Sequence, residues 1–181
     1  MVVLYRPDAA VLAVDPANRC GWSFWLHGAL VASGVLPPVT RDGGAMGVDV
    51  KGSYRVFRQF QQQANAAGEK VGVLVVEQQF PKGDMGQFES LQREIEARQT
   101  WECWAVLHDW RIERVFPSTW QSATGLGRVR SDRKRNSLVV ASKIVGRQVQ
   151  DDNEADAVLL GSFAVRRARA SEAVRETRAG R

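Results

Sequence analysis

The sequence predicts an α/β protein with a mixed five-stranded sheet, in which three antiparallel strands are followed by parallel strands and helices flank the faces. Three observations support this prediction. Two strand-like runs, 21–26 and 29–36, are separated only by His27 and Gly28, a turn of hairpin length. The run 71–76 is continuously apolar, as in a strand that is buried on both faces. Helix-like and strand-like segments then alternate, which is typical of parallel strands.

The first strand is predicted at residues 11–14, and it should end at Asp15 because Pro16 has no N–H to donate to a sheet. The runs 21–26 and 29–36 complete an antiparallel meander. The elements that follow are predicted, in order, as a loop at 40–47, a helix up to Gly68, the strand 71–76 running into Glu77, a loop at 80–87, a helix at 88–110, a strand at 111–116 ended by Pro117, and helices at 136–145 and 154–170.

The length bounds the number of domains. A chain of 181 residues can form one domain with a substantial core but not two ordinary enzyme domains. We expect a single domain at 1–170 and a basic, flexible tail at 171–181. No apolar run approaches the roughly 18 residues that span a bilayer, and no signal peptide is evident, so we expect a cytoplasmic protein without membrane contact. Cys20 and Cys103 belong to no metal motif, so neither zinc nor a disulfide is predicted.

The net charge of +5 is concentrated in one stretch of the chain. Between positions 128 and 147 only one acidic residue, Asp132, accompanies the basic residues Arg128, Arg130, Arg133, Lys134, Arg135, Lys143 and Arg147. Such a cluster is typical of a surface that binds nucleic-acid phosphates. The alternative is a charged face that is merely solvated.

Acidic residues stand where the predicted strands and helices begin or end. Asp15 and Glu77 each follow a strand, and four others lie near the start of the last helix: Asp151, Asp152, Glu154 and Asp156. Each alone is equally consistent with a turn or cap residue. If the first and fourth strands are neighbours, however, Asp15 and Glu77 lie side by side at depth, where two like charges are costly without a cation. Mg²⁺ prefers oxygen ligands, so carboxylates without Cys or His favour it over zinc.

Four short segments occur in a specific order along the chain: DPANRCGW (15–22), VVEQQF (75–80), PSTWQSATGLG (117–127) and DDNEADAVLLG (151–161). In this order and spacing they resemble the RuvC family of Holliday-junction resolvases in their phage-type form. The resemblance implies an RNase H-like fold, a homodimer, and endonucleolytic cleavage of branched DNA such as a four-way junction. It also implies two Mg²⁺ ions per active site, with Mn²⁺ as a substitute, and the cytoplasm of a bacterial or phage-infected cell.

The resemblance assigns catalytic, metal-binding roles to three residues. Asp15 matches the family's first aspartate, Glu77 its glutamate, and Asp156 the aspartate of its A-D-A motif. We assign the bridge between the two metals to Asp15, with Glu77 on one metal and Asp156 with a neighbour on the other. In two-metal hydrolysis one ion activates the attacking water and the other stabilises the leaving oxygen, so no side-chain nucleophile is needed.

The sequence departs from the family in three places. Asn153 stands where the family has an acid or a histidine, and Ala17 stands where many relatives have a glycine, a change that a short turn tolerates. Trp120 and Gln121 occupy the place of a family lysine. Lys134 is our candidate for the missing active-site cation. Phe80 matches the family's DNA-stacking phenylalanine, although a core role for it is the alternative. The expected DNA contacts are Phe80, Gln78, Arg128, Arg130, Arg133, Lys134 and Arg135.

Helical geometry narrows the choice of a fourth metal ligand. Around a helix axis Asp152 lies about 40° from Asp156, Asn153 about 60° and Glu154 about 160°, so Glu154 should point elsewhere. Asp152 offers a charged oxygen and Asn153 a neutral one, so we expect Asp152 to be the ligand. If the helix begins only at Asn153 or Glu154, this arithmetic does not fix the direction of Asp152.

Other functions fit the sequence less well. Another RNase H-like nuclease acting on branched or flap DNA is the nearest alternative, whereas a transposase needs a DNA-recognition domain for which the chain has no room. Actin-like sugar kinases and ATPases also have an aspartate after their first strand, but they need a Gly/Thr-rich phosphate loop there, and Pro16-Ala17-Asn18 provides none. A catalytically silent DNA-junction-binding protein is favoured only by Asn153.

Overall fold

A five-stranded sheet forms the centre of the protein in the computed structural model, which describes residues 5–6, 8–17, 19–41, 46–78, 88–126 and 130–179. Its strands, in the spatial order β3-β2-β1-β6-β7, are β1 (Val11–Asp15), β2 (Cys20–Leu26), β3 (Ala29–Leu36), β6 (Val73–Glu77) and β7 (Arg111–Val115). β1, β2 and β3 pair antiparallel, whereas β6 pairs parallel with both β1 and β7. The predicted mixed sheet, with its first and fourth predicted strands adjacent, is confirmed.

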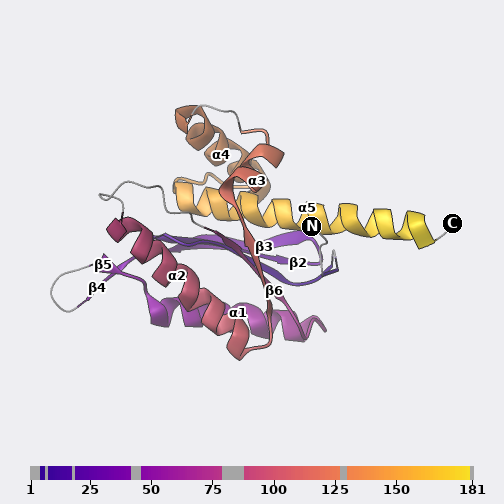
Figure 1. Cartoon of the computed structure of the whole chain (residues 1–181), viewed down its shortest axis with the longest axis horizontal. Helices are drawn as coiled ribbons and strands as arrows, with labels where there is room; N and C mark the ends of the chain where they lie inside the picture. Colours follow the sequence, from indigo (N-terminus) through magenta and orange to yellow (C-terminus); the bar gives the residue numbers. More distant parts are fainter. Residues whose placement is uncertain are drawn as a thin grey trace.

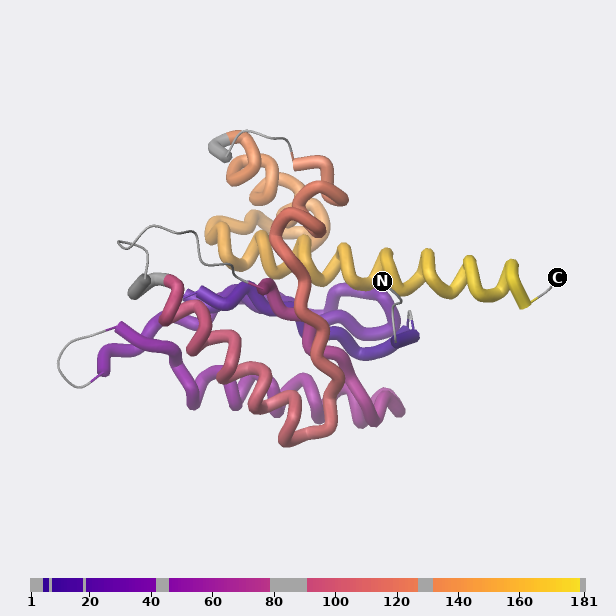
Figure 2. The backbone as a smooth tube through the Cα atoms, viewed as in Figure 1, coloured from indigo at the N-terminus to yellow at the C-terminus, as the bar shows by residue number. Residues whose placement is uncertain are grey.

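Helices cover both faces of this sheet (Figure 1). On one face lie α1 (Val50–Ala66) and α2 (Phe88–Leu107), and on the other lies α5 (Asp152–Ala179). Two shorter helices, α3 (Pro117–Ala123) and α4 (Arg130–Val145), pack against the first half of α5. The tube in Figure 2 shows that α5 crosses the sheet and that its C-terminal part extends beyond it. None of the described helices is long and apolar enough to cross a membrane.

The alternation of side chains along the inner strands divides the interior into two cores. Val11 and Ala13 of β1 pack on the α5 side, whereas Leu12 and Val14 pack on the side of α1 and α2. β6 alternates in the same way. Each inner strand therefore has an apolar core on both faces, which explains why its sequence is continuously hydrophobic.

The first half of α5 is seated on β2 by two close approaches. The Ser23 hydroxyl donates a hydrogen bond to the Ala157 carbonyl at 2.7 Å. Gly21 pairs with Asp15 across the β1–β2 ladder, and its missing side chain lets the backbone of Asn153 approach the strand. The start of α5 therefore lies beside the end of β1.

One helix and a pair of short strands were not predicted from the sequence. Pro117 was expected only to end a strand, but it is also the first residue of α3, where its missing N–H costs no hydrogen bond. β4 (Val39–Thr40) and β5 (Met46–Gly47) pair as a small separate sheet around the predicted loop at 40–47.

The two last helices are longer than the sequence pattern indicates. α4 begins at Arg130, several residues before its apolar positions start. α5 begins at Asp152 rather than Glu154, and it continues through Ala179, so that residues 171–179 of the expected tail are helical. Its start at Asp152 places that residue in the first turn, as the geometric argument for the fourth ligand requires.

Candidate metal centre

The C-terminal ends of β1 and β6 bring two carboxylates together. Val14 pairs with Val76 in the parallel ladder, so Asp15 and Glu77 occupy the next positions on neighbouring strands. Strand alternation directs both side chains to the face covered by α5. Both residues are buried, with exposed fractions of only 9% and 8%.

Asp156 belongs to the same group and comes from the second turn of α5. Burial is the main reason why the pKa of Asp15 lies well above its usual range, and the charges of Glu77 and Asp156 raise it further. Glu94 of α2 and Asp152 of α5 add smaller effects of the same sign. Carboxylates from two strands and two helices therefore act on one another at this edge of the sheet.

The protonation of Asp156 is shifted in the same direction. Burial raises its pKa to about 6, against an opposing hydrogen bond from Ser137 of α4. The charge of Asp152 raises the pKa as well, whereas the cations Lys134 and Arg133 lower it. Near neutral pH the group is therefore an anion that is held in place by α4.

Glu77 has a neutral hydrogen-bond donor in the core. The indole Nε1–H of Trp120, in α3, donates to Glu77 Oε2 at 2.6 Å. Trp120 is itself almost completely buried in the core between the sheet and α5. From the sequence, Trp120 was notable only because it stands in place of a family lysine. In the structure it contacts a predicted metal ligand.

Basic side chains of α4 stand beside the carboxylates. Lys134 forms an ion pair with Asp152, and a hydrogen bond from Lys134 is the main reason why the pKa of Asp152 is lowered. Arg133 donates to Gln121 Oε1 at 2.7 Å, and its charge reaches Asp156. Lys134, the candidate for an active-site cation, therefore stands beside Asp152.

The residues that open α5 have distinct partners. Asp151 caps the helix by accepting from the Asn153 backbone N–H at 2.9 Å, and it pairs with Arg19. Glu154 accepts from the Ser33 hydroxyl at 2.6 Å and pairs with Arg147. Glu154 thus points to β3, away from the carboxylates, in the direction that helical geometry predicts. Asp152 contributes to the field at Asp15, and it remains our choice for the fourth ligand.

The structure describes some of the residues expected to contact DNA and not others. Phe80 and Arg128, together with the side chain of Arg130, lie outside the described residues. Arg135 is exposed on α4. Gln78 follows β6 directly, and its backbone N–H donates to the Val115 carbonyl at 2.9 Å, so that it extends the β6–β7 ladder.

Sequence reasoning missed two polar residues of this centre, Glu94 and Ser137. Glu94 lies in a helix whose charged residues alternate with apolar ones without a marked pattern, and Ser137 lies within the basic stretch. Neither belongs to a motif. Only the packing of α2 and α4 against the strand ends brings them near Asp15 and Asp156.

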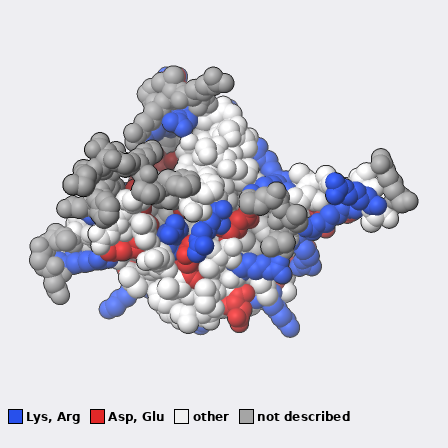
Figure 3. All heavy atoms as spheres, in the orientation of Figure 1, with Lys and Arg blue, Asp and Glu red and all other residues white. Residues whose placement is uncertain are grey.

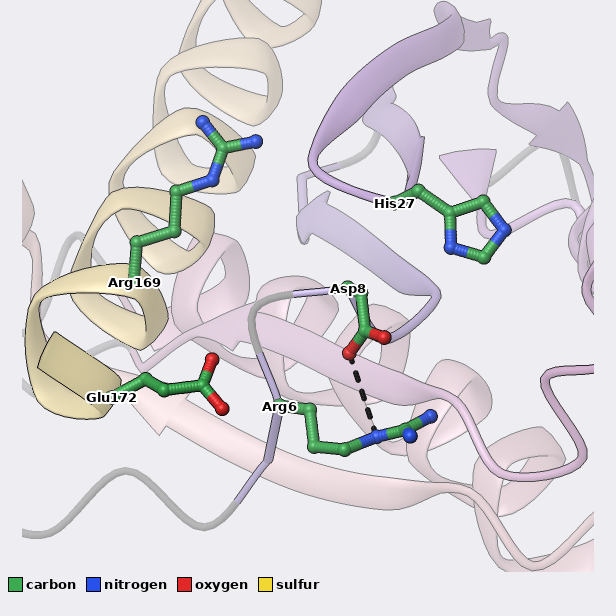
Figure 4. Close-up of a pocket in the computed structure, with 5 residues that line it drawn as sticks. All are labelled: Arg6, Asp8, His27, Arg169 and Glu172. Carbon is green, nitrogen blue, oxygen red and sulfur yellow. Dashed lines mark ion pairs between the residues drawn. The ribbon is translucent and has the colours of Figure 1, made fainter. Parts of the chain in front are cut away.

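A second group of titratable side chains lies at the other end of β1. Asp8, His27 and Glu69 have possible ligand atoms within 4.8 Å of one another. Arg6 donates to both oxygens of Glu69, at 3.0 and 2.9 Å, and pairs with Asp8, so a cation of the protein already offsets part of the charge of the two carboxylates. Figure 4 shows Arg6, Asp8 and His27 in an open pocket with a volume of about 470 Å³ that residues of α5 also line. We assign no function to it.

The surface charge is mixed on the face seen in Figure 3, where Lys and Arg alternate with acidic residues. Blue spheres are prominent on the part of α5 that extends beyond the sheet (Figure 3). The exposed basic residues there are Arg166, Arg169, Arg175 and Arg178. They are far along α5 from the carboxylates, which lie at its first two turns.

The arrangement suits divalent-cation chemistry. Buried carboxylates that repel one another gain stability when a cation neutralises them, and their oxygens are ligands that Mg²⁺ and Mn²⁺ prefer. The neighbouring cations of α4 are suited to hold an anionic substrate. Among the described residues no Ser/His or Cys/His pair accompanies the carboxylates, so these are the groups at the centre that can carry chemistry.

Comparison with solved structures identifies the fold. Thermus thermophilus RuvC in complex with a Holliday junction substrate aligns with a TM-score of 0.61 and 15% identity, over 89% of this chain and 96% of that chain. A second structure of Thermus thermophilus RuvC gives a TM-score of 0.57 over the same shares, again at 15% identity. The yeast mitochondrial Holliday junction resolvase gives 0.58 at 14% identity, over 95% of this chain and 84% of that one. No protein-family model and no curated protein sequence matches this chain. The predicted RuvC-like, RNase H-like fold is therefore confirmed.

Proposed function

We propose that this protein is a divalent-metal-dependent endonuclease that cleaves branched DNA, with the four-way Holliday junction as its substrate. The observation that carries the proposal is that Asp15, Glu77 and Asp156 lie together at one edge of the sheet. The charges of Glu77 and Asp156 raise the pKa of Asp15 there. The fold is shared with RuvC, for which a complex with a Holliday junction substrate is known. That likeness supports branched DNA as the substrate.

The carboxylates fit two Mg²⁺ ions, with Mn²⁺ as a substitute. Asp15 is the most suitable bridging ligand, because the charges of both Glu77 and Asp156 act on it. Glu77 would then bind one ion, and Asp156 with Asp152 the other. Asp152 is half-buried and charged, whereas Asn153 offers only a neutral oxygen.

The chain's own residues hold this centre and the substrate in place. Bound metal ions would supply an activated water and stabilise the leaving 3′ oxygen. The strands fix Asp15 and Glu77, and the seating of α5 on β2 fixes Asp156. Lys134, beside Asp152, is placed to bind the phosphate that enters the site, and Arg133 and Arg135 extend the basic surface along α4.

Two copies of the chain fit the proposed reaction. A four-way junction is resolved by one cut in each of two strands, so a homodimer related by a twofold axis would present one carboxylate centre to each strand. We accordingly propose a homodimer as the active form.

The proposal is tested by incubating the protein with four-way, flap and linear duplex DNA in the presence of Mg²⁺, Mn²⁺ or EDTA. We expect metal-dependent cleavage of the four-way junction in preference to the linear duplex. Asp15→Asn and Glu77→Gln should abolish cleavage and leave junction binding nearly intact, because they remove metal ligands but no phosphate contacts.

Asp109→Asn is the matched control, because Asp109 is an exposed aspartate in the turn before β7. It should cleave at the wild-type rate. Wild-type rates in Asp15→Asn or Glu77→Gln would contradict the metal assignment. Metal-independent junction binding without cleavage by the wild type would instead favour a silent DNA-binding protein, and preferential cleavage of flaps would favour another RNase H-like nuclease.

A further inference from the structure

We infer that Trp120 is a positioning residue for the metal centre, which fixes the orientation of the Glu77 carboxylate through its indole N–H. This inference rests on the proposed metal-dependent function. Trp120 lies in α3, a helix that contains none of the catalytic residues predicted from the sequence.

The contact itself is short and buried. Trp120 Nε1 lies 2.6 Å from Glu77 Oε2, and the two residues are 1% and 8% exposed. A hydrogen bond to an ionised group in such surroundings is stronger than one between neutral groups, because little water competes for it. Glu77 therefore has a directional partner that is neutral and does not cancel its charge.

The carboxylate needs such a partner to hold one orientation. The backbone of Glu77 is fixed by its pairing with Val115 in the β6–β7 ladder. The last torsion of a glutamate side chain, in contrast, has a broad and nearly flat preference, so the ladder does not set the plane of the carboxylate. The indole N–H, which donates to one oxygen, restricts it.

Trp120 is itself held rigidly enough to serve this purpose. α3 begins at Pro117, directly after β7, and Pro at the first helical position fixes where the helix starts. The indole ring is buried in the same apolar core as Leu126 and as Leu160 of α5. The same core that supports Asp156 from α5 therefore supports Glu77 through Trp120, and the two carboxylates are positioned relative to each other.

A lysine would act differently at this place. A lysine ammonium beside Glu77 would add a positive charge next to the carboxylate, whereas an indole N–H orients the carboxylate without adding charge. Outer hydrogen-bond partners of metal ligands typically change metal affinity or activity by about 10- to 100-fold when they are removed. We expect an effect near the lower limit, because the ladder still holds the Glu77 backbone.

The test removes the N–H in two variants, of which the second also keeps the ring volume. In Trp120→Phe, and in a chain with the isosteric 3-benzothienylalanine at position 120, the Mn²⁺ affinity should fall about 10-fold. It is measured by calorimetry on the full-length protein without DNA. The half-saturating Mg²⁺ concentration for junction cleavage should rise by a similar factor, while the rate at saturating Mg²⁺ changes less. Trp110→Phe is the control, because Trp110 is buried and its Nε1 has no hydrogen-bond partner among the described residues.

Thermal unfolding separates positioning from general damage to the core. The benzothienyl chain keeps the packing of the ring and loses only the hydrogen bond, so its unfolding temperature should fall less than that of Trp120→Phe. A loss of Mn²⁺ affinity in a benzothienyl chain that is still fully folded at the assay temperature therefore supports the inference even if Trp120→Phe is unstable. Unchanged Mn²⁺ affinity in the benzothienyl chain, together with lost affinity in Glu77→Gln, would overturn the role of Trp120 and leave the proposed function intact. No Mn²⁺ binding by the wild type would overturn both.

Discussion

Gly21 and Asn153 approach so closely that a Cβ atom added at position 21 would lie 1.9 Å from the Asn153 carbonyl oxygen. The first residue belongs to β2 and the second to the first turn of α5. Since Gly21 pairs directly with Asp15, this contact sets how near the start of α5 comes to the end of β1. The distance between Asp15 and Asp156 depends on it.

The first prediction follows from this contact. In Gly21→Ala the start of α5 must move away from the sheet, and the overpacking should lower the free energy of unfolding by about 1–3 kcal/mol. Mn²⁺ affinity and junction cleavage should fall further than stability alone explains. Gly34→Ala is the control, because its Cβ would meet the Trp22 ring and not α5. Equal metal affinity in the two variants, measured by calorimetry, would contradict the prediction.

The second prediction concerns pH. The pKa of Asp156 rises from 3.8 to about 6 on folding, so between these values the folded state holds a proton that the unfolded state has released. The free energy of unfolding should therefore fall as pH rises through this range, by at most roughly 3 kcal/mol for this group. Asp15 acts in the same direction. Mg²⁺ should reverse the fall, because it binds the deprotonated groups.

Denaturant unfolding at pH 4 to 7, with and without Mg²⁺, measures this effect in the wild type and in Asp156→Asn. The variant lacks the titrating group, so its stability should depend less on pH over this range. The same slope in both proteins would show that Asp156 ionises normally.

The third prediction concerns the fourth metal ligand. Asp152→Asn should lower Mg²⁺-dependent cleavage, whereas Asn153→Ala should change it little. Glu154→Gln should keep its activity but lose about 1–3 kcal/mol of stability, because Glu154 is a buried charged partner of Ser33 and Arg147. Cleavage assays and thermal unfolding of the three variants check this. Loss of cleavage in Glu154→Gln with Asp152→Asn unaffected would show that the ligand has been misassigned.

The fourth prediction concerns the basic stretch. A variant with Ala at 128, 130, 133 and 135 should bind junctions with a weaker salt dependence, since each lost phosphate contact lowers the slope of log K against log salt by about 0.9. Arg55→Ala, an exposed arginine of α1 on the opposite face, should leave the slope unchanged. Fluorescence anisotropy at several salt concentrations gives both slopes. An unchanged slope in the first variant would favour the alternative interpretation, in which the basic stretch is a solvated surface that binds no phosphate.

The sequence predicted those parts of the site that depend on strands and on helical periodicity. The apolar runs before Asp15 and Glu77 indicated two buried strands that each end in a carboxylate, and the parallel pairing of these strands places the two carboxylates side by side. The direction of Glu154 followed from the angle between helical positions. The strand ends and the helical angle depend only on local geometry, whereas the pairing of β1 with β6 does not.

The remaining parts depend on packing between distant segments. α3 was missed because proline is equally suited to end a strand and to begin a helix, and Pro117 does both. The hydrogen bond from Trp120 to Glu77 joins residues far apart in the sequence, as does that from Ser137 to Asp156. Neither pair has a spacing that a sequence pattern could indicate.

The two cores of the molecule share the backbone of β1. Leu12 and Val14 face α1 and α2, while the next residue carries the central carboxylate on the opposite side. A substitution that repacks the core around Phe57 or Phe60 therefore shifts the strand that bears Asp15, without touching any ligand or its hydrogen-bond partners. The proposed activity is thus adjustable through core positions that contact none of the carboxylates at the centre.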